Sequence, residues 1–275
     1  MTTAPAVEQW LVLVGLPAVL TVSWLSGLGG SLAFGLGAES LWASERTALT
    51  AFTANYAHVH ARHLFDNIIN FWVTLFAIYP LVAIAGWSRR FRLSLLSYLF
   101  VVPFGIAAVT LAVLEPNPWQ VAVGFSGVVA ALLGLLPVVG AAALCAETDG
   151  VISPVWAVVP FCGSLGLVFL APSITAEPIG MLVGVGWLLA ASVIGGLCWW
   201  ADRPLDHGDT RDRLPDDHRL AFLIGATVFV FGVFGAFVFV GSATNVWGHL
   251  AGYVAGFVIP YVGFVVLPAV GSVVR

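Results

Sequence analysis

The feature that most constrains this chain is a series of apolar runs, each about as long as a helix needs to cross a lipid bilayer. The hydrocarbon core is about 30 Å thick and an α-helix rises about 1.5 Å per residue, so one span takes roughly 20 apolar residues. Of the 275 residues, 60% are hydrophobic and only 9% are charged, and the mean hydropathy is +1.01. We count eight runs, at 10–35, 60–85, 93–114, 121–145, 153–172, 178–199, 219–241 and 245–270.

These runs predict an all-α polytopic membrane protein with about eight transmembrane helices, forming a single domain over residues 1–275. Only helices and closed barrels satisfy every backbone polar group in lipid, and the runs lack the period-two alternation of barrel strands. The N-terminal segment carries no Lys or Arg, and the run behind it is too long for a signal-peptide core. We therefore expect an uncleaved first span.

The positions of the arginines predict how the spans are oriented, because short cytoplasmic loops carry an excess of positive charge. With eight spans, the loops after the second and sixth spans lie on the same side as both termini. This side is predicted to be cytoplasmic and includes an acidic loop at 201–218. Its arginines are Arg89, Arg90, Arg92, Arg203, Arg211, Arg213, Arg219 and Arg275, whereas Arg46 and Arg62 lie near the opposite face.

The formal net charge of −4 argues against a nucleic acid as partner, since nucleic-acid affinity depends on basic surfaces. The acidic loop is compatible either with adaptation to high salt or with an ordinary solvated segment. Cys145, Cys162 and Cys198 are scattered without the spacing of a metal site, so we interpret them as packing residues.

Polar residues gather in three stretches that begin spans, where ionisable groups need water, a partner or a function. One of them, in the last span, holds His249, followed by Gly252 and Gly256 at i+3 and i+7. Small residues at this spacing let another helix approach closely. Either the imidazole simply bonds that helix, or the approach brings a reactive group against it.

Ser126 is the candidate for that reactive group. It lies near the start of the fourth span, between Gly124 and Gly127. A serine in a transmembrane helix is usually inert and bonds the carbonyl four residues back. The soluble-hydrolase elbow is excluded, because it needs a glycine two residues after the serine, where this chain has Val128.

The third stretch opens the second span. His63 and Asn67, at i and i+4, share a helix face, and His58 precedes them. Donors on one face suit an oxyanion hole. Two other interpretations stay open: a polar interfacial rim, or a metal site using His58, His60, His63 and Asp66. Because even numbers of crossings separate the second, fourth and eighth spans, the three stretches are expected at one depth, near the non-cytoplasmic face.

Together, these motifs resemble those of the rhomboid intramembrane serine proteases, and they occur in the family's order. The resemblance implies a six-helix core made of spans one to four, the last span and one of spans five to seven, with an added helix pair. The matching residues are His58, His63 and Asn67 for the spaced histidines and asparagine, Gly124, Phe125, Ser126 and Gly127 for the GxSG motif, and His249, Gly252 and Gly256 for the histidine with glycines.

The resemblance further implies a Ser-His dyad, with Ser126 as nucleophile and His249 as general base. The backbone N–H of Ser126 and the side chains of Asn67 and His63 would bind the oxyanion, and His58 would support them. The implied activity is that of an endopeptidase in the lipid bilayer, which cuts single-span membrane proteins near the non-cytoplasmic face. Neither a cofactor nor a metal is implied.

The chain departs from the family pattern in four places. Ala130 stands where an aromatic residue often packs on the catalytic histidine, and Phe125 is bulkier than usual within GxSG. The first long loop has Trp42 and, four residues on, Arg46, rather than a Trp-Arg pair. Finally, three expected spans rather than one separate the serine and histidine helices.

Three other functions remain as alternatives. A catalytically silent rhomboid-like protein would bind membrane clients, although the chain retains both dyad residues. A transporter would use the polar layer as its binding site, but such sites lie near the middle of the bilayer. A metalloprotease of the HExxH type lacks its motif in this sequence.

Overall fold

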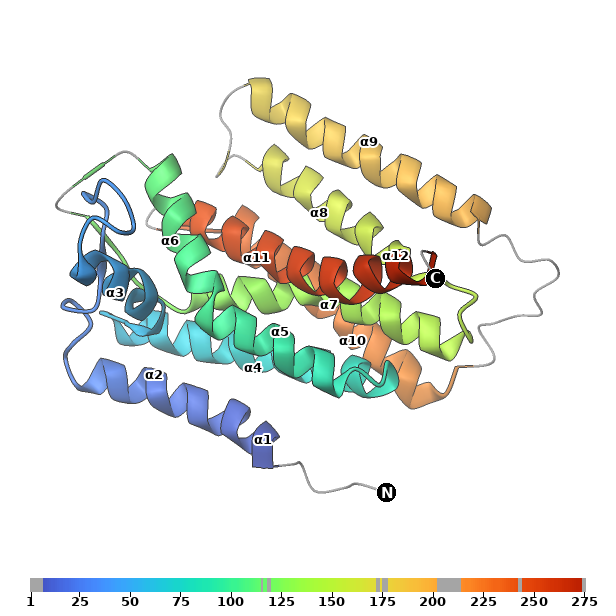
Figure 1. Ribbon diagram of the computed structural model, residues 1–275, viewed down its shortest axis with the longest axis horizontal. Coiled ribbons are helices and arrows are strands. Elements are labelled where there is room, and N and C mark those ends of the chain that lie inside the picture. The colour runs from blue at the N-terminus through green and yellow to red at the C-terminus, as the bar shows by residue number, and fades with distance from the viewer. Residues whose placement is uncertain are drawn as a thin grey trace.

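The computed structural model is a bundle of helices with a small cap of loops at one end (Figure 1). It describes residues 7–114, 116–117, 120–171, 174, 178–201, 214–241 and 244–273. Apart from two paired strands of two residues each, the regular structure of these residues is helical, so the prediction of an all-α chain is confirmed. The elements are α1 (Val7–Trp10), η1 (Leu11–Gly15), α2 (Leu16–Leu25), β1 (Phe34–Gly35), α3 (Glu45–Thr53), η2 (Ala54–Tyr56), α4 (Ala61–Ile84), α5 (Ser88–Phe100), α6 (Val102–Val113), β2 (Val121–Ala122), α7 (Ser126–Glu147), η3 (Pro154–Ala157), α8 (Val158–Leu170), α9 (Pro178–Ala201), α10 (Asp216–Val233), η5 (Phe234–Val238), α11 (Val246–Tyr261), η6 (Val262–Val266) and α12 (Leu267–Val273).

The protein is a multi-pass membrane protein with five to six candidate spans, fewer than the eight expected. Among the described residues, five helices are long and apolar enough to cross a bilayer, and α5 with α6 makes a sixth if this pair, bent by 44°, counts as one. The other two expected spans contain only shorter apolar helices, Leu11–Leu25 and Pro154–Leu170. Apolar composition alone overestimated the length of these two helices. In the first case the helix ends at Leu25, just before Gly27 turns the chain with a φ of +70°.

Helix α7 forms the centre of the bundle, and 78% of its most apolar 18-residue stretch is buried. It packs against α11 through glycines at i, i+4 spacing. A Cβ added to Gly252 would lie 2.0 Å from the carbonyl oxygen of Gly127, and one added to Gly256 would lie 2.0 Å from that of Ala131. Backbones this close gain van der Waals contact and Cα–H···O interactions that larger residues would prevent.

Helices α8 and α9 form an antiparallel pair at one edge of the bundle, and α2 lies at the opposite edge (Figure 1). Glycines again set the spacing, because a Cβ on Gly184 would lie 3.0 Å from the carbonyl oxygen of Gly166. The outer face of α9 exposes large apolar side chains, including Leu182 and Trp200, as expected for a helix that faces lipid. The two helices thus cover the central bundle from outside.

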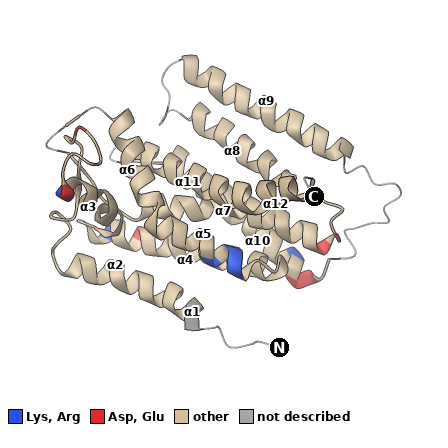
Figure 2. Ribbon diagram, in the orientation of Figure 1, with Lys and Arg blue, Asp and Glu red and all other residues tan. Residues whose placement is uncertain are grey.

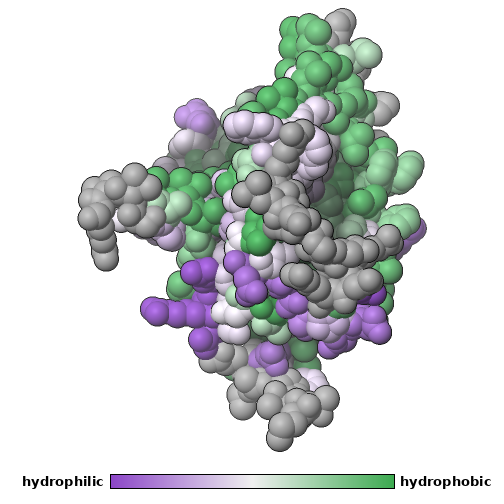
Figure 3. Space-filling model, turned by 90° about the vertical axis from the view of Figure 1, so that its right-hand side faces the viewer, coloured by the Kyte–Doolittle hydropathy of each residue, from purple (hydrophilic) through white to green (hydrophobic). Residues whose placement is uncertain are grey.

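Charged residues of the described chain gather mainly at the end of the bundle where α5 and α10 begin (Figure 2). Viewed from this end, hydrophilic side chains occupy the lower part of the face and hydrophobic ones the upper part (Figure 3). There, His218 Nδ1 lies 3.0 Å from Glu147 Oε1, joining α10 to α7. Arg203, Arg211, Arg213, Arg275 and most of the acidic loop (202–213) lie outside the described residues. The cytoplasmic assignment of this end stays a prediction.

Candidate functional site

At the opposite end, a cavity of about 1060 Å³ lies where α4, α7 and α11 begin. Its walls include Ser126, His249, His63, Asn67 and Gly124. The three polar stretches of the sequence, which are far apart along the chain, therefore share one hollow at the same end of the bundle. The volume is large enough for many water molecules and for a peptide segment.

Ser126 is the first residue of α7, so its backbone N–H has no acceptor within that helix. The segment that leads into Ser126 is held by two sets of backbone hydrogen bonds. Strand β2 pairs with β1 in antiparallel register, and the N–H of Gly124 donates to the carbonyl of Ala54 at 2.9 Å. The contacts with β1 and η2 therefore fix the position at which Ser126 begins the central helix.

Gly124 is required for two reasons. Its φ of +122° lies in a region that side chains rarely adopt, and an added Cβ would lie 2.4 Å from Cε1 of His63. The imidazole of His63 is thus in direct contact with the backbone two residues before Ser126. This contact brings an N–H donor of α4 close to the start of α7.

The bulk of Phe125 does not enter the cavity. Its side chain is fully buried and packs between the rings of Tyr56 and Phe71, with both centroids at 5.7 Å. Similarly, Trp42 is not among the cavity residues and stacks on Phe104. Both departures from the rhomboid pattern are accommodated outside the walls of the cavity.

The imidazole of His249 is held by a contact with η5. Its Nδ1 lies 3.0 Å from the carbonyl oxygen of Ala236, and because a carbonyl only accepts, Nδ1 must carry the hydrogen. In the neutral ring Nε2 is then unprotonated and can accept a proton. The ring of Phe237, fully buried, lies edge-on with its centroid 6.4 Å away. Since Ala130 supplies no ring, the π-helical turn η5 provides the aromatic contact to His249.

Asn245 organises the start of α11. Its side-chain oxygen accepts from the N–H of Gly248 at 2.9 Å, which makes it the N-cap of the helix that bears His249. Its amide nitrogen donates to the hydroxyl of Thr110 at 2.8 Å. The cap thus joins α11 to α6 one turn before His249.

His58 lies behind the cavity wall rather than in it. Its side chain is 1% exposed, and its Nε2 is 2.8 Å from Nδ2 of Asn67. Burial, with a smaller contribution from His63, lowers the pKa of His58 to about 4, so near neutral pH the ring is uncharged and can accept. The Asn67 amide uses one hydrogen for His58, which leaves its second N–H for a ligand in the cavity.

The two residues of the candidate dyad, Ser126 and His249, line one cavity, and no hydrogen bond joins them in the described part of the chain. Catalytic hydrogen bonds are often longer without substrate and shorten in the complex. Within the same residues, no three His, Cys, Asp or Glu side chains are grouped as a metal site, so His58, His60, His63 and Asp66 do not form one. Gly252 and Gly256 lie at the α7–α11 contact, below the cavity.

Sequence reasoning missed the residues that orient His249. Asn245 had a usable signal, because Asn before a helix is a frequent N-cap. Ala236 acts through its backbone, and Phe237 is one of 19 phenylalanines, so neither has a distinguishing sequence pattern.

Comparison with known proteins adds no assignment: no family model, no curated protein and no solved structure matches this chain.

Proposed function

We propose that the protein is an intramembrane serine endopeptidase of the rhomboid type, which cleaves single-span membrane proteins from the cavity at the start of α4, α7 and α11. The observation that carries this proposal is the presence of a serine hydroxyl and an oriented imidazole in the walls of one cavity. Ser126 begins α7, and His249 donates through Nδ1 to Ala236, which leaves Nε2 as a base. A serine hydroxyl needs such a base to become a nucleophile.

In this proposal Ser126 Oγ attacks the scissile carbonyl while Nε2 of His249 takes the hydroxyl proton. The oxyanion that forms accepts hydrogen bonds from the N–H of Ser126 and the side chains of Asn67 and His63. The partial positive charge at the N-terminus of α7 adds to this stabilisation. The imidazolium then protonates the leaving amine, and a water activated by the same imidazole hydrolyses the acyl-enzyme.

The test is cleavage of a tagged single-span substrate by the purified protein in liposomes. We expect Ser126→Ala and His249→Ala to lower kcat/KM by about a thousandfold or more, since dyad groups act as a unit. Asn67→Ala should cost about a hundredfold, as the loss of one oxyanion donor typically does. Ser192→Ala on α9 is the matched control, because its hydroxyl only bonds Leu188 within the helix.

A serine-reactive phosphonate gives a readout that needs no substrate. It should label the wild type and Ser192→Ala but not Ser126→Ala. Cleavage by Ser126→Ala at the wild-type rate would disprove the mechanism. If the folded wild type neither cleaves nor reacts with the phosphonate, the protein is instead a silent, client-binding relative.

A further inference from the structure

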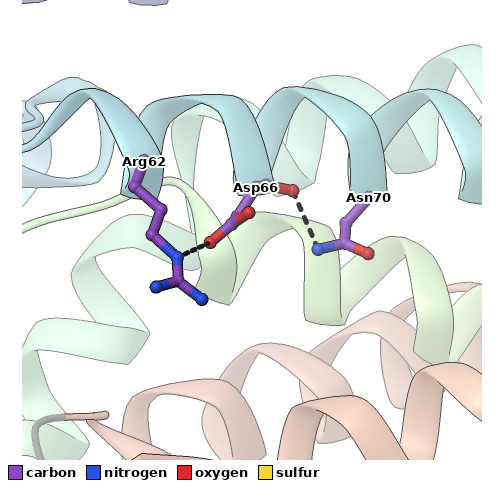
Figure 4. Close-up of polar contacts among 3 residues, drawn as sticks. All are labelled: Arg62, Asp66 and Asn70. Atoms are coloured by element: carbon purple, nitrogen blue, oxygen red, sulfur yellow. Dashed lines mark hydrogen bonds and ion pairs between the residues drawn. The ribbon is translucent and has the colours of Figure 1, made fainter.

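One flank of α4 carries polar side chains although the helix is long and apolar enough to cross a membrane. Arg62, Asp66 and Asn70 follow one another at intervals of four residues, and their side chains leave the helix on the same side (Figure 4). All three are exposed and all three line the cavity. The neighbouring flank, with Phe65 and Ile69, is apolar and exposed and takes no part in the cavity.

The contacts within this flank leave hydrogen-bond acceptors unused. Nε of Arg62 is 3.9 Å from Oδ2 of Asp66, a distance at the limit of an ion pair, and the two side chains are 94% and 60% exposed. The amide nitrogen of Asn70 donates to the backbone carbonyl of Asp66 at 2.8 Å. The Asp66 carboxylate and the Asn70 side-chain oxygen therefore face the cavity as acceptors.

Such acceptors need partners. An exposed carboxylate on a span is costly in lipid, and polar groups in membrane helices are usually paired with another helix or with water. Among the cavity residues, Gly235 on η5 and Phe239 and Val240 just after it supply no side-chain donor. Within the described residues, Arg62 is the one side chain paired with the Asp66 carboxylate, and no donor bonds the side-chain oxygen of Asn70.

The flank also lies at the right place to act on a substrate. Asp66 is adjacent in sequence to Asn67, whose side chain lines the cavity near the start of α7, and Asn70 is one turn further along α4. Farther down, α4 and α10 are in contact, since a Cβ on Gly225 would lie 2.8 Å from Leu81. A segment held between them would meet Asp66 and Asn70 within about two turns of the bond to be cut.

Resting on the proposed function, we propose that this flank, residues Arg62, Asp66 and Asn70, selects substrates whose transmembrane segment carries a hydrogen-bond donor within about two turns of the scissile bond. A side chain such as Asn, Gln or Lys supplies the donor that the acceptors of Asp66 and Asn70 lack. A substrate whose transmembrane segment is wholly apolar would leave the acceptors of Asp66 and Asn70 without a hydrogen-bond partner.

The experiment compares two substrates that differ at one transmembrane residue, Gln or Leu, placed successively along the two turns next to the cut. Interhelical hydrogen bonds in membranes contribute modestly, so we expect kcat/KM to favour the Gln substrate about three- to tenfold at one or two positions. Asp66→Leu and Asn70→Leu should reduce this preference toward one. Asp66→Asn, which keeps an acceptor, should retain most of it, and Phe65→Leu, on the apolar flank, should not change it.

Binding of both segments to Ser126→Ala in detergent separates this inference from the proposed function. Preferential binding of the Gln segment that Asp66→Leu abolishes supports the inference even if the wild type cuts nothing. If Asp66→Leu changes cleavage and binding of both segments equally, the flank serves hydration or folding and the inference is wrong. If Ser126→Ala with an intact flank binds the Gln and Leu segments equally, the inference is also wrong.

Discussion

At the scale of single residues, His58 makes the site sensitive to acid. Its pKa is lowered to about 4, from an ordinary value near 6.5, because the ring is buried. Between these values the unfolded chain binds a proton that the folded protein does not. The free energy of unfolding therefore falls as pH drops from about 6.5 to 4, by up to about 3 kcal/mol for this residue.

We predict that His58→Gln shows a weaker loss of stability over this pH range than the wild type, since the Gln oxygen can accept from Asn67 without titrating. Thermal unfolding in detergent at pH 7.5 and pH 5 measures the difference. His63 and His249 are common to both proteins, so their contributions cancel in the comparison. An identical pH dependence would mean that His58 is not the group responsible.

Phe237 contacts the ring of His249 edge-on and is not among the cavity residues, so in the proposed mechanism it would orient His249 rather than bind substrate. We predict that Phe237→Leu lowers kcat about ten- to hundredfold with little change in KM, because a displaced general base loses alignment with the nucleophile. Phe231→Leu on α10 is the matched control, because Phe231 is 73% exposed. A fall in activity that merely follows a fall in unfolding temperature would indicate a packing role instead.

At the scale of elements, the contact of α7 with α11 determines whether the two halves of the candidate dyad can meet. We predict that Gly252→Ala and Gly256→Ala each destabilise the protein by about 1–3 kcal/mol and lower activity, because the added Cβ would overlap the backbone of α7. Gly263→Ala in η6 is the control, since its Cβ meets nothing within 4 Å. Unfolding and cleavage assays on the three variants test this; equal behaviour of all three would contradict it.

At the scale of the whole molecule, the arginine pattern predicts which end faces the cytoplasm. Ser40, in the loops at the cavity end, and Ser88, at the start of α5, are both exposed. In a background without the native cysteines, we expect a membrane-impermeant thiol reagent applied to intact cells to label Ser40→Cys but not Ser88→Cys. Labelling of Ser88→Cys alone would reverse the predicted orientation.

Sequence reasoning located most helices, but it predicted the length of only some of them correctly. The runs at 60–85, 121–145 and 178–199 correspond closely to α4, α7 and α9, because a span is recorded locally as a continuous apolar stretch. The run at 93–114 instead folds as two helices bent by 44°. The break at Val101 and the proline at 103 are local signals that an average of hydropathy hides.

The sequence by itself determined an all-α membrane protein and the kinds of polar side chain available for chemistry, because hydropathy and residue type are properties of short segments. Only the tertiary structure decided which of them share a cavity. His249 depends on a backbone carbonyl at Ala236, and Phe125 is accommodated between Tyr56 and Phe71. These contacts follow from how closely α11 packs against η5, and the start of α7 against η2 and α4. Such packing depends on the shapes of distant side chains, which have no local pattern.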